Sequence, residues 1–320
     1  MKILIASKID ADAIEKLKEN HDVVCAFGAD KETLKSAIQG CEVLIFRSGV
    51  DISAEVMASA PTLKMLIRGG SGTDNVDMEY VDRQGLRLVR VPGPGAKSVA
   101  ELTFALMLAL ARRVVEADRL TRQGHWAKSE LAGYLLTGKT LGVLGAGNIG
   151  GLVAHMGAAW GMDVLACVEH PSPERKESFD KAGIVLTTRD RIMAEADFIG
   201  VHVPLKPDTR NFVDTEQIAL MKKNAYLVNI ARGGVVNEAA LYTALAEGRI
   251  GGAALDVHQA EGEGKVSPLA DFKNVILTPH IGASTFDSQK EIGRIILETM
   301  DAFTMEQIPV RSVQEHPANV

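Results

Sequence analysis

The sequence predicts an α/β protein built from two doubly wound domains with parallel sheets. Short apolar runs alternate with longer amphipathic stretches almost from end to end, and this alternation is typical of parallel strands joined by helices. The chain has 320 residues, which corresponds to two domains at about 150 residues each. A proline- and glycine-rich stretch, Pro92 to Gly95, separates two series of apolar runs and marks a domain boundary.

The first series predicts a five-stranded sheet. Its buried strands are expected at Lys2–Ala6, Asp22–Ala26, Val43–Phe46, Lys64–Arg68 and Leu86–Val89. Amphipathic segments between them, such as residues 11–19 and 31–38, have the period of helices. One long helix, from about Lys97 to Gln123, is expected after the boundary.

The second series predicts a seven-stranded sheet, which is a full dinucleotide-binding sheet with one additional strand. The strands are expected at Leu141–Leu144, Asp163–Val168, Ile184–Leu186, Phe198–His202, Tyr226–Ile230, Ala253–Asp256 and Val275–Leu277. A last helix, Ser284 to about Phe303, follows after this sheet is complete. We expect that helix to return to the first domain, which would comprise residues 1–97 and 285–320 and enclose a second domain of residues 98–284.

The composition excludes several classes of protein. With 46% hydrophobic and 24% charged residues, the composition is that of an ordinary globular protein. Its net charge of -6 gives no long-range attraction to nucleic acid or anionic membranes. Three separated cysteines suggest neither a disulfide framework nor a metal site. The apolar run Leu102–Ala111 is shorter than a membrane span, and no secretory signal is evident, so we expect a cytoplasmic protein.

A glycine-rich loop stands between the first strand and first helix of the second series. It reads Gly145-Ala146-Gly147-Asn148-Ile149-Gly150, a G-x-G-x-x-G in the strand–turn–helix context of a dinucleotide site. Gly145 would allow the tight turn, Gly147 the approach of the pyrophosphate, and Gly150 the packing of helix on strand. A purely structural tight turn is the alternative.

The carboxylate that should hold the adenosine ribose is displaced by one residue. The fingerprint places an acid about 20 residues after the loop; Val168 stands eighteen residues after Gly150, and Glu169 is next. Arg175 and Lys176 lie farther along. These residues favour NAD, with NADP not excluded; the alternative is that Glu169 is a solvated loop residue.

Three further segments end strands of the second sheet, at the edge where open α/β sheets bind ligands. They carry Arg232, Glu261 and His280. A carboxylate bonded to one imidazole nitrogen fixes the tautomer, so that the other nitrogen can exchange a proton with a carbonyl or alcohol. An arginine can hold a substrate carboxylate bidentately. Together they suit hydride transfer with a nicotinamide cofactor, although each alone could be structural.

With these motifs, the chain resembles the D-isomer-specific 2-hydroxyacid dehydrogenases, most closely the D-3-phosphoglycerate dehydrogenase branch. The similar motifs are Ile45-Phe46-Arg47-Ser48, the run from Arg68 to Asp77, Ala100-Glu101-Leu102-Thr103, the glycine loop, His202-Val203-Pro204-Leu205, Ala231-Arg232-Gly233-Gly234 and Pro279 to Thr285. The resemblance implies two Rossmann-like domains, a flavodoxin-like substrate domain and a dinucleotide-binding domain, with a cleft between them. The helix 97–123 has a wide apolar face that includes Leu102, Phe104, Ala105, Leu108 and Ala109. This face predicts a dimer, which the resemblance supports; burial of the face inside the monomer is the alternative.

The resemblance also implies roles for individual residues. His280 would be the acid/base, Glu261 its paired carboxylate and Arg232 the substrate-orienting arginine. Dinucleotide contacts would come from Ser71, Asn148, Ile149, Val203, Ile230, Ala231, Asp256, Gly282 and Ala283, as well as from Arg232 and His280. The substrate carboxylate would meet the loop of Gly69, Gly70, Ser71, Gly72 and Thr73. Arg47 would meet a distal phosphate, or else be an exposed strand-end arginine.

The sequence departs from the family pattern at three places. Glu261 is followed by Gly262-Glu263-Gly264 instead of proline, Gly70 replaces a common alanine, and Val168 replaces the ribose acid. We therefore expect an NAD-dependent D-2-hydroxyacid dehydrogenase acting on a small anionic substrate that resembles 3-phosphoglycerate. Reduction of hydroxypyruvate, glyoxylate or a phosphonate analogue is the alternative within the class, and an NAD-sensing interaction scaffold is the alternative outside it.

Overall fold

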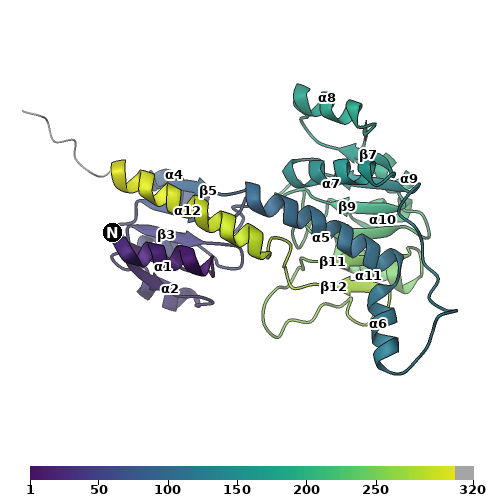
Figure 1. Ribbon diagram of the computed structural model, residues 1–320, viewed down its shortest axis with the longest axis horizontal. Helices are drawn as coiled ribbons and strands as arrows, with labels where there is room; N and C mark the ends of the chain where they lie inside the picture. The colour runs from purple at the N-terminus through teal and green to yellow at the C-terminus, as the bar shows by residue number, and fades with distance from the viewer. Residues whose placement is uncertain (307–320) are drawn as a thin grey trace, which may run out of the picture. The chain divides into compact units, whose positions relative to one another are not determined.

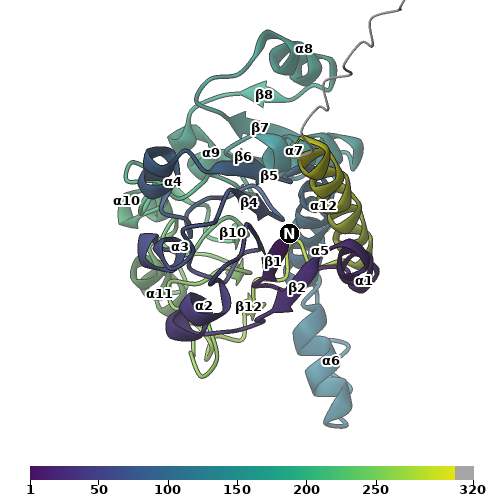
Figure 2. The ribbon, with the colours of Figure 1, turned by 90° about the vertical axis from the view of Figure 1, so that its left-hand side faces the viewer.

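The chain forms two compact units in the computed structural model, which describes residues 1–306. One unit contains Met1–Pro94 together with the segment that starts at Thr285, and the other contains Gly95–Ser284. Each unit has one sheet in which every strand pairs in parallel with its neighbours, as Figures 1 and 2 show. The predicted α/β class is confirmed.

The first unit has five strands in the order β2-β1-β3-β4-β5, the flavodoxin-like order. They are β1 (Lys2–Ile5), β2 (Asp22–Cys25), β3 (Val43–Phe46), β4 (Met65–Arg68) and β5 (Arg87–Arg90). The predicted strand ends differ from these by at most one residue. The helices are α1 (Ala11–Asn20), α2 (Lys31–Ala37), α3 (Ala54–Ala58), α4 (Met78–Gln84) and α12 (Phe286–Glu306).

The last helix, α12, belongs to the first unit. Ile292, Ile296, Met300 and Phe303 of α12 join a buried cluster with strand residues such as Ile3, on the face that α1 also covers. A second cluster, with Leu34 of α2 and Val56 of α3, covers the opposite face. The sheet is therefore buried on both sides, which explains why its strands are continuous apolar runs.

The second unit has seven strands in the order β12-β11-β10-β9-β6-β7-β8. They are β6 (Thr140–Leu144), β7 (Asp163–Cys167), β8 (Val185–Leu186), β9 (Phe198–Val201), β10 (Tyr226–Asn229), β11 (Gly252–Leu255) and β12 (Val275–Leu277). All seven predicted strands are confirmed. The helices are α5 (Gly93–Ala111), which crosses the boundary between the units, α6 (Val114–Arg122), α7 (Asn148–Ala159), α8 (Pro173–Lys181), α9 (Arg189–Glu195), α10 (Thr215–Leu220) and α11 (Glu238–Ala246).

This strand order is that of a dinucleotide-binding sheet. From β6, successive strands are added first on one side (β7, β8) and then, starting with β9, on the other, so the switch point lies between β6 and β9. Ligands of open α/β sheets bind beyond the carboxyl ends of the strands at such a switch point. Both the glycine loop after β6 and the residues after β9 therefore belong to the binding edge.

Side-chain caps define where many helices begin. Asp10, Asp30, Asp77, Thr188 and Asn237 each accept a hydrogen bond from a backbone N–H in the first turn of the helix that follows. Such a cap satisfies an amide that has no partner within the helix. The helix positions could therefore be predicted from polar residues as well as from apolar period.

The prediction of one continuous helix from Lys97 to Gln123 is wrong. The helix ends at Ala111, and α6 begins at Val114 after Arg113 adopts a left-handed conformation with φ 52°. The carbonyl of Ala111 accepts a hydrogen bond from the Tyr134 N–H at 2.8 Å, and Arg113 binds Glu116 at 2.7 Å. The Tyr134 N–H therefore occupies the carbonyl of the last residue of α5, and the Arg113–Glu116 ion pair lies at the start of α6.

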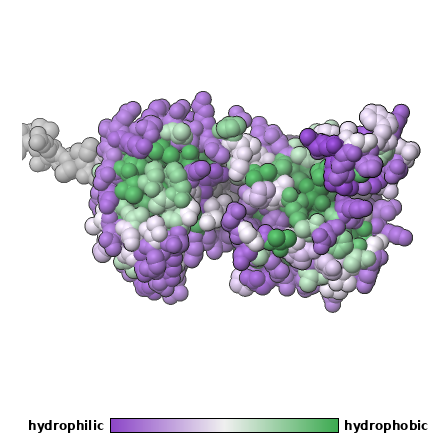
Figure 3. Space-filling model, turned by 90° about the horizontal axis from the view of Figure 1, so that it is seen from below, coloured by the Kyte–Doolittle hydropathy of each residue, from purple (hydrophilic) through white to green (hydrophobic). Residues whose placement is uncertain are grey.

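The α5 helix is long and apolar enough to cross a membrane by length and composition. About half of its residues are buried inside the structure, where Phe104, Met107 and Leu110 pack in a cluster with Leu141 and Val143 of β6. That packing is typical of the core helix of a globular domain. Apolar surface bordered by hydrophilic residues is also visible on the face drawn in Figure 3.

A histidine just after β9 has both of its ring nitrogens buried. Neither ring nitrogen of His202 has a hydrogen-bond partner within residues 1–306, and both are buried. The ring lies over Gly200, where a Cβ would come 2.7 Å from its Nε2. Burial lowers the pKa of His202 from 6.5 to about 3.

The lowered pKa predicts acid-sensitive folding. In the unfolded state the His202 imidazole binds a proton below about pH 6.5, whereas in the folded state it stays neutral down to about pH 3. The free energy of unfolding therefore decreases as the pH falls from about 6.5 towards 3. Between about pH 7 and about pH 5 the loss is roughly 2 kcal/mol. Urea unfolding should show that His202→Phe removes this part of the pH dependence.

The exposed His170 supplies the control. His170→Gln should leave the pH dependence of unfolding as it is in the unsubstituted protein. If His202→Phe and the unsubstituted protein lose the same free energy between these pH values, the neutral buried imidazole is not the cause.

Candidate active site

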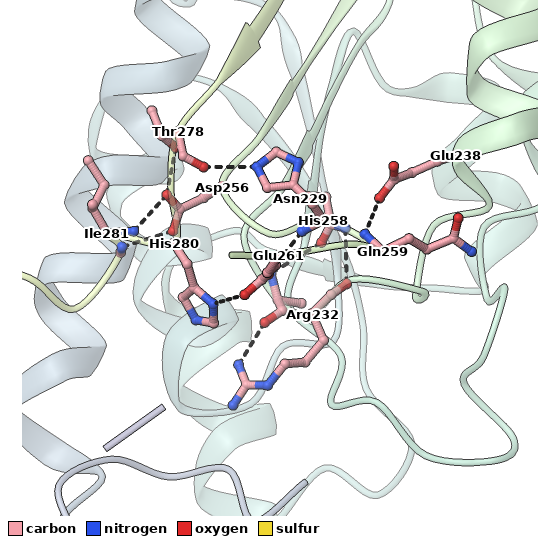
Figure 4. Close-up of polar contacts among 12 residues, drawn as sticks. Asn229, Arg232, Glu238, Asp256, His258, Gln259, Glu261, Thr278, His280 and Ile281 are labelled. Atoms are coloured by element: carbon pink, nitrogen blue, oxygen red, sulfur yellow. Dashed lines mark hydrogen bonds and ion pairs between the residues drawn. The ribbon is translucent and has the colours of Figure 1, made fainter. Parts of the chain in front are cut away.

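Three loops meet where the neighbouring strands β10, β11 and β12 end. Arg232 follows β10, Glu261 lies in the loop after β11, and His280 follows β12. Parallel strands bring their carboxyl ends to one edge, so residues that are far apart in the sequence become neighbours. Figure 4 shows the His280 ring, the Glu261 carboxylate and the Arg232 guanidinium gathered there.

His280 and Glu261 form a short ion pair. The Nδ1 atom of His280 lies 2.8 Å from Glu261 Oε2, and Nε2 has no hydrogen-bond partner within the described part of the chain. The carboxylate therefore orients the ring and leaves Nε2 for another group. His280 has a positive φ of 55°, a costly conformation for a residue with a side chain and one that is concentrated at functional sites.

The Glu261 carboxylate is held in its ionised form. Burial acts to raise the pKa of Glu261, but its hydrogen bonds with His280 and the His258 N–H, and the charge of these imidazoles, outweigh burial and lower the pKa. The His258 N–H donates to Glu261 Oε1 at 3.0 Å. One oxygen therefore anchors the carboxylate to its own loop, and the other faces His280.

Asp256 fixes the loop that carries His280. Its carboxylate is buried and accepts hydrogen bonds from the Thr278 hydroxyl at 2.6 Å, the Ile281 N–H at 2.9 Å and the Gly282 N–H at 2.8 Å. The His280 N–H donates to the backbone carbonyl of Asp256 at 2.8 Å. This network compensates the burial of the charge and determines the backbone conformation of His280.

Arg232 lies in a loop that touches the Glu261 loop backbone to backbone. A Cβ on Gly233 would come 1.9 Å from the His258 carbonyl oxygen, so only glycine permits this approach. Asn229 donates a side-chain hydrogen bond to the Arg232 carbonyl at 3.1 Å, and Arg232 Nη1 donates to the Ala231 carbonyl at 2.7 Å. The guanidinium is thereby placed on the side where His280 lies.

The glycine loop has the geometry of a dinucleotide cradle. Gly145 has φ +90°, and a Cβ there would meet the Val203 backbone nitrogen at 2.8 Å. A Cβ on Gly150 would meet the Gly145 carbonyl oxygen at 2.3 Å, whereas the space beside Gly147 is open. Gly147 caps α7 without a side chain, so the first-turn N–H groups at Asn148 and Ile149 remain available to an anion. These residues fit a nicotinamide dinucleotide.

The other predicted dinucleotide contacts in the second unit lie along the same edge. Val203, Ile230 and Ala231 are nearly buried beyond β9 and β10, and Gly282 lies against Asp256 and Ile230. Ala283 follows Gly282 in the His280 loop. Glu169, in contrast, is exposed and lies 3.7 Å from His170, so its carboxylate lies in solvent.

The predicted substrate loop belongs to the first unit. Gly69, Gly70, Ser71 and Gly72 follow β4, and a Cβ on Gly69 would lie 3.2 Å from Arg47 Cγ. The buried Arg68 donates from Nε to the Gly72 carbonyl at 2.8 Å. Two arginines therefore lie beside this turn: Arg68, which hydrogen-bonds to its backbone, and Arg47, which is partly buried next to it.

Several supporting residues were not predicted from the sequence. Glu238 is buried and accepts a hydrogen bond from the Gln259 N–H at 2.6 Å, and His258 Nε2 lies 2.9 Å from the Thr278 carbonyl oxygen. Both contacts tie down the Glu261 loop (Figure 4). Glu238 could have been noticed only as an acid beside the helix-capping Asn237, because its partner is a backbone group that is distant in the sequence.

A family model matches more than half of the chain. Residues 104–282 match the D-isomer specific 2-hydroxyacid dehydrogenase, NAD binding domain. The chain belongs to this family. The matched segment contains the glycine loop, Arg232, Glu261 and His280, so the family assignment predicted from the motifs is confirmed.

Individual relatives agree with this assignment. The chain is 44% identical over 299 residues to a D-3-phosphoglycerate dehydrogenase of Methanocaldococcus jannaschii, covering 93% of this chain and 56% of that protein. It therefore spans little more than half the length of that relative. The crystal structure of D-lactate dehydrogenase from Aquifex aeolicus complexed with NAD and lactic acid superposes with a TM-score of 0.82 at 31% identity, covering 96% of this chain and 97% of that one.

A third neighbour carries a different cofactor. An acyclic imino acid reductase in complex with NADPH and D-Arg superposes with a TM-score of 0.83 at 25% identity, covering 96% of this chain and 98% of that one. The same fold thus holds NAD in one neighbour and NADPH in another.

The Gly233 contact predicts a sensitive position. Gly233→Ala should push the Arg232 and His258–Glu261 loops apart, because the added Cβ would lie 1.9 Å from a backbone oxygen. A displacement of about 1 Å can cost roughly 100-fold in rate. Steady-state kinetics with a 2-oxo acid and NADH should show a fall of that order in kcat/KM.

Gly93→Ala is the matched control, because a Cβ there meets nothing within 4 Å. It should leave kcat/KM and the melting temperature unchanged. Normal turnover of Gly233→Ala would contradict the claim that this contact positions the two loops.

Proposed function

We propose that the protein is an NAD-dependent dehydrogenase that interconverts a D-2-hydroxy acid and its 2-oxo acid. The observation that carries this proposal is the His280–Glu261 pair at 2.8 Å, beside Arg232, in a domain whose glycine loop fits a dinucleotide. When bound, the nicotinamide ring supplies the hydride or receives it.

His280 is the proposed acid/base. Its Nδ1 is engaged by Glu261, so the proton exchanged with substrate is held at Nε2. In reduction, the protonated ring donates that proton to the carbonyl oxygen; in oxidation, the neutral ring accepts it from the hydroxyl. The ionised Glu261 stabilises the charged imidazole in either direction.

Arg232 is the proposed anchor for the substrate. Its guanidinium can hold the carboxylate of a 2-oxo acid through two parallel hydrogen bonds and polarise the neighbouring carbonyl. The loop from Gly69 to Gly72 is proposed to contribute to carboxylate binding, and Asp256 to face the nicotinamide amide through the remaining acceptor capacity of its oxygens.

Arg47 supports a substrate with a second anionic group. Burial lowers the pKa of its guanidinium, and the side chain lies against Gly69, at the start of the turn that is proposed to contribute to carboxylate binding. A substrate of the 3-phosphoglycerate class fits this charge. Initial rates for matched 2-oxo acids with and without a terminal phosphate, with either NADH or NADPH, test both substrate class and cofactor.

The proposed role of His280 predicts a selective loss of turnover. His280→Ala should retain NADH binding within about threefold, while kcat falls by roughly 10²–10⁴-fold because general acid–base catalysis is removed. NADH binding can be followed by fluorescence, and turnover by nicotinamide absorbance. Near-normal turnover by this variant would remove the assignment.

We further propose a homodimer through α5, α6 and the segment that follows, working in the cytoplasm. Val114, Val115, Trp126 and Leu135 are between half and largely exposed, which is unusual for apolar side chains gathered on one stretch of a monomer. A cavity of about 310 Å³, lined by Arg113, Val115 and other residues, offers a recess for a side chain of the second copy. The three cysteines are free, as suits a reducing compartment.

Sedimentation velocity tests the dimer. The unsubstituted protein should sediment as a dimer at micromolar concentration, and Val115→Glu should shift it to monomer because a charge would be buried in the interface. Val266, which is 80% exposed on another loop, provides the control: Val266→Glu should remain dimeric. A monomeric unsubstituted protein would contradict this interface.

A further inference from the structure

The adenosine end of the dinucleotide site lacks its expected carboxylate. Val168 stands at the end of β7 and packs against the core of the second unit. Glu169 is exposed beside His170. A carboxylate at this point selects NAD because it binds the ribose hydroxyls and repels a 2′-phosphate. The side chain that would exclude the phosphate is therefore absent from the Val168 position.

An arginine lies on the glycine loop instead. Arg175, in the first turn of α8, donates from Nη1 to the Ala146 carbonyl at 2.7 Å and to the Gly147 carbonyl at 2.6 Å. Its guanidinium also lies over the ring of the buried Phe179, with the central carbon 6.0 Å from the ring centre. These contacts hold a cation next to the open space beside Gly147.

Within the described residues, no carboxylate pairs with Arg175. No aspartate or glutamate within residues 1–306 forms an ion pair with it, and its Nε and Nη2 groups make no hydrogen bond to those residues. The positive charge of Arg175 and the donors on its Nε and Nη2 are therefore available to a ligand. Arginine can bind a phosphate bidentately through such donors.

The loop also provides room for this arginine. Gly151 follows the fingerprint, and a Cβ there would come 2.5 Å from Arg175 Nη1. A side chain at Gly151 would therefore displace the end of Arg175 from the loop, because the arginine is the more flexible of the two groups. This arrangement is a property of the folded chain, since 24 positions separate the two residues.

We propose that Arg175 determines cofactor choice by receiving the 2′-phosphate of NADP(H), so that the protein binds NADP(H) as well as NAD(H). This inference rests on the proposed function, because it concerns the cofactor of the same site. It extends that function from one dinucleotide to both, and it assigns the difference between them to one guanidinium and to the missing acid at Val168.

Dinucleotide binding without substrate tests the inference. Dissociation constants of NADH and NADPH should be measured by fluorescence for the unsubstituted protein and for Arg175→Gln. The unsubstituted protein should bind both within about tenfold of each other. Arg175→Gln should weaken NADPH roughly 10-fold or more, the effect of losing a charge-assisted hydrogen bond, and change NADH less than about threefold.

Three further variants separate charge from shape. Lys176→Gln removes a neighbouring positive charge and should leave the preference unchanged. Gly151→Ala moves Arg175 without removing it and should weaken NADPH selectively. Val168→Asp restores the acid and should weaken NADPH roughly 10-fold without weakening NADH.

Two outcomes would overturn the inference. One is binding of NADH without measurable binding of NADPH by the unsubstituted protein. The other is an equal loss of both dinucleotides in Arg175→Gln, which would show that Arg175 acts on the shared pyrophosphate or on the loop. Failure of the proposed function is different: dinucleotides would bind, but no 2-oxo acid would be turned over.

Discussion

The active-site edge depends on one buried carboxylate. Asp256, at the end of β11, receives three hydrogen bonds from the loop after β12, while its own carbonyl receives the N–H of His280. Because the charge is buried, leaving any of these donors or the carboxylate unpaired would be costly. The loop is thus confined to one path, on which His280 adopts its left-handed conformation and presents Nδ1 to Glu261.

Around this constraint, the site is assembled by close backbone contacts more than by side-chain packing. Gly233 brings the Arg232 loop against the His258 carbonyl, and Gly145 brings the glycine loop against Val203. Both contacts occur where neighbouring parallel strands end. Such contacts leave little freedom to the groups that they position, which is what pre-organised catalysis requires.

The two ends of the dinucleotide site differ in how closely their residues match the family motifs. The end near His280 carries the residues proposed for acid–base chemistry and substrate binding, whereas the adenosine end has Val168 where the dinucleotide fingerprint places an acid, and it has Arg175 lying on the glycine loop. The proposed hydride transfer requires the residues near His280 to keep their geometry. The presence or absence of a 2′-phosphate on the adenosine ribose affects only the binding of the dinucleotide. The adenosine end of the site can therefore vary without altering the reaction.

The sequence by itself determined the sheets, the path of α12 and the order of the motifs. Apolar runs and polar caps are local signals, and strand ends such as Val43–Phe46 and Val275–Leu277 were predictable to the residue. It also predicted Arg232, Glu261 and His280, because each directly follows or lies just beyond a strand that ends at one edge.

Only the tertiary structure decided the break after Ala111, the donors to Asp256 and the position of Arg175. The helix break depends on Tyr134 returning to take the Ala111 carbonyl, and Arg175 meets a loop 28 residues earlier in the chain. Periodicity indicates which face of a helix or strand is buried. It does not indicate which distant group will donate a hydrogen bond to a given carbonyl or carboxylate. Those partners are fixed when the strands align, because only then do their carboxyl ends share an edge.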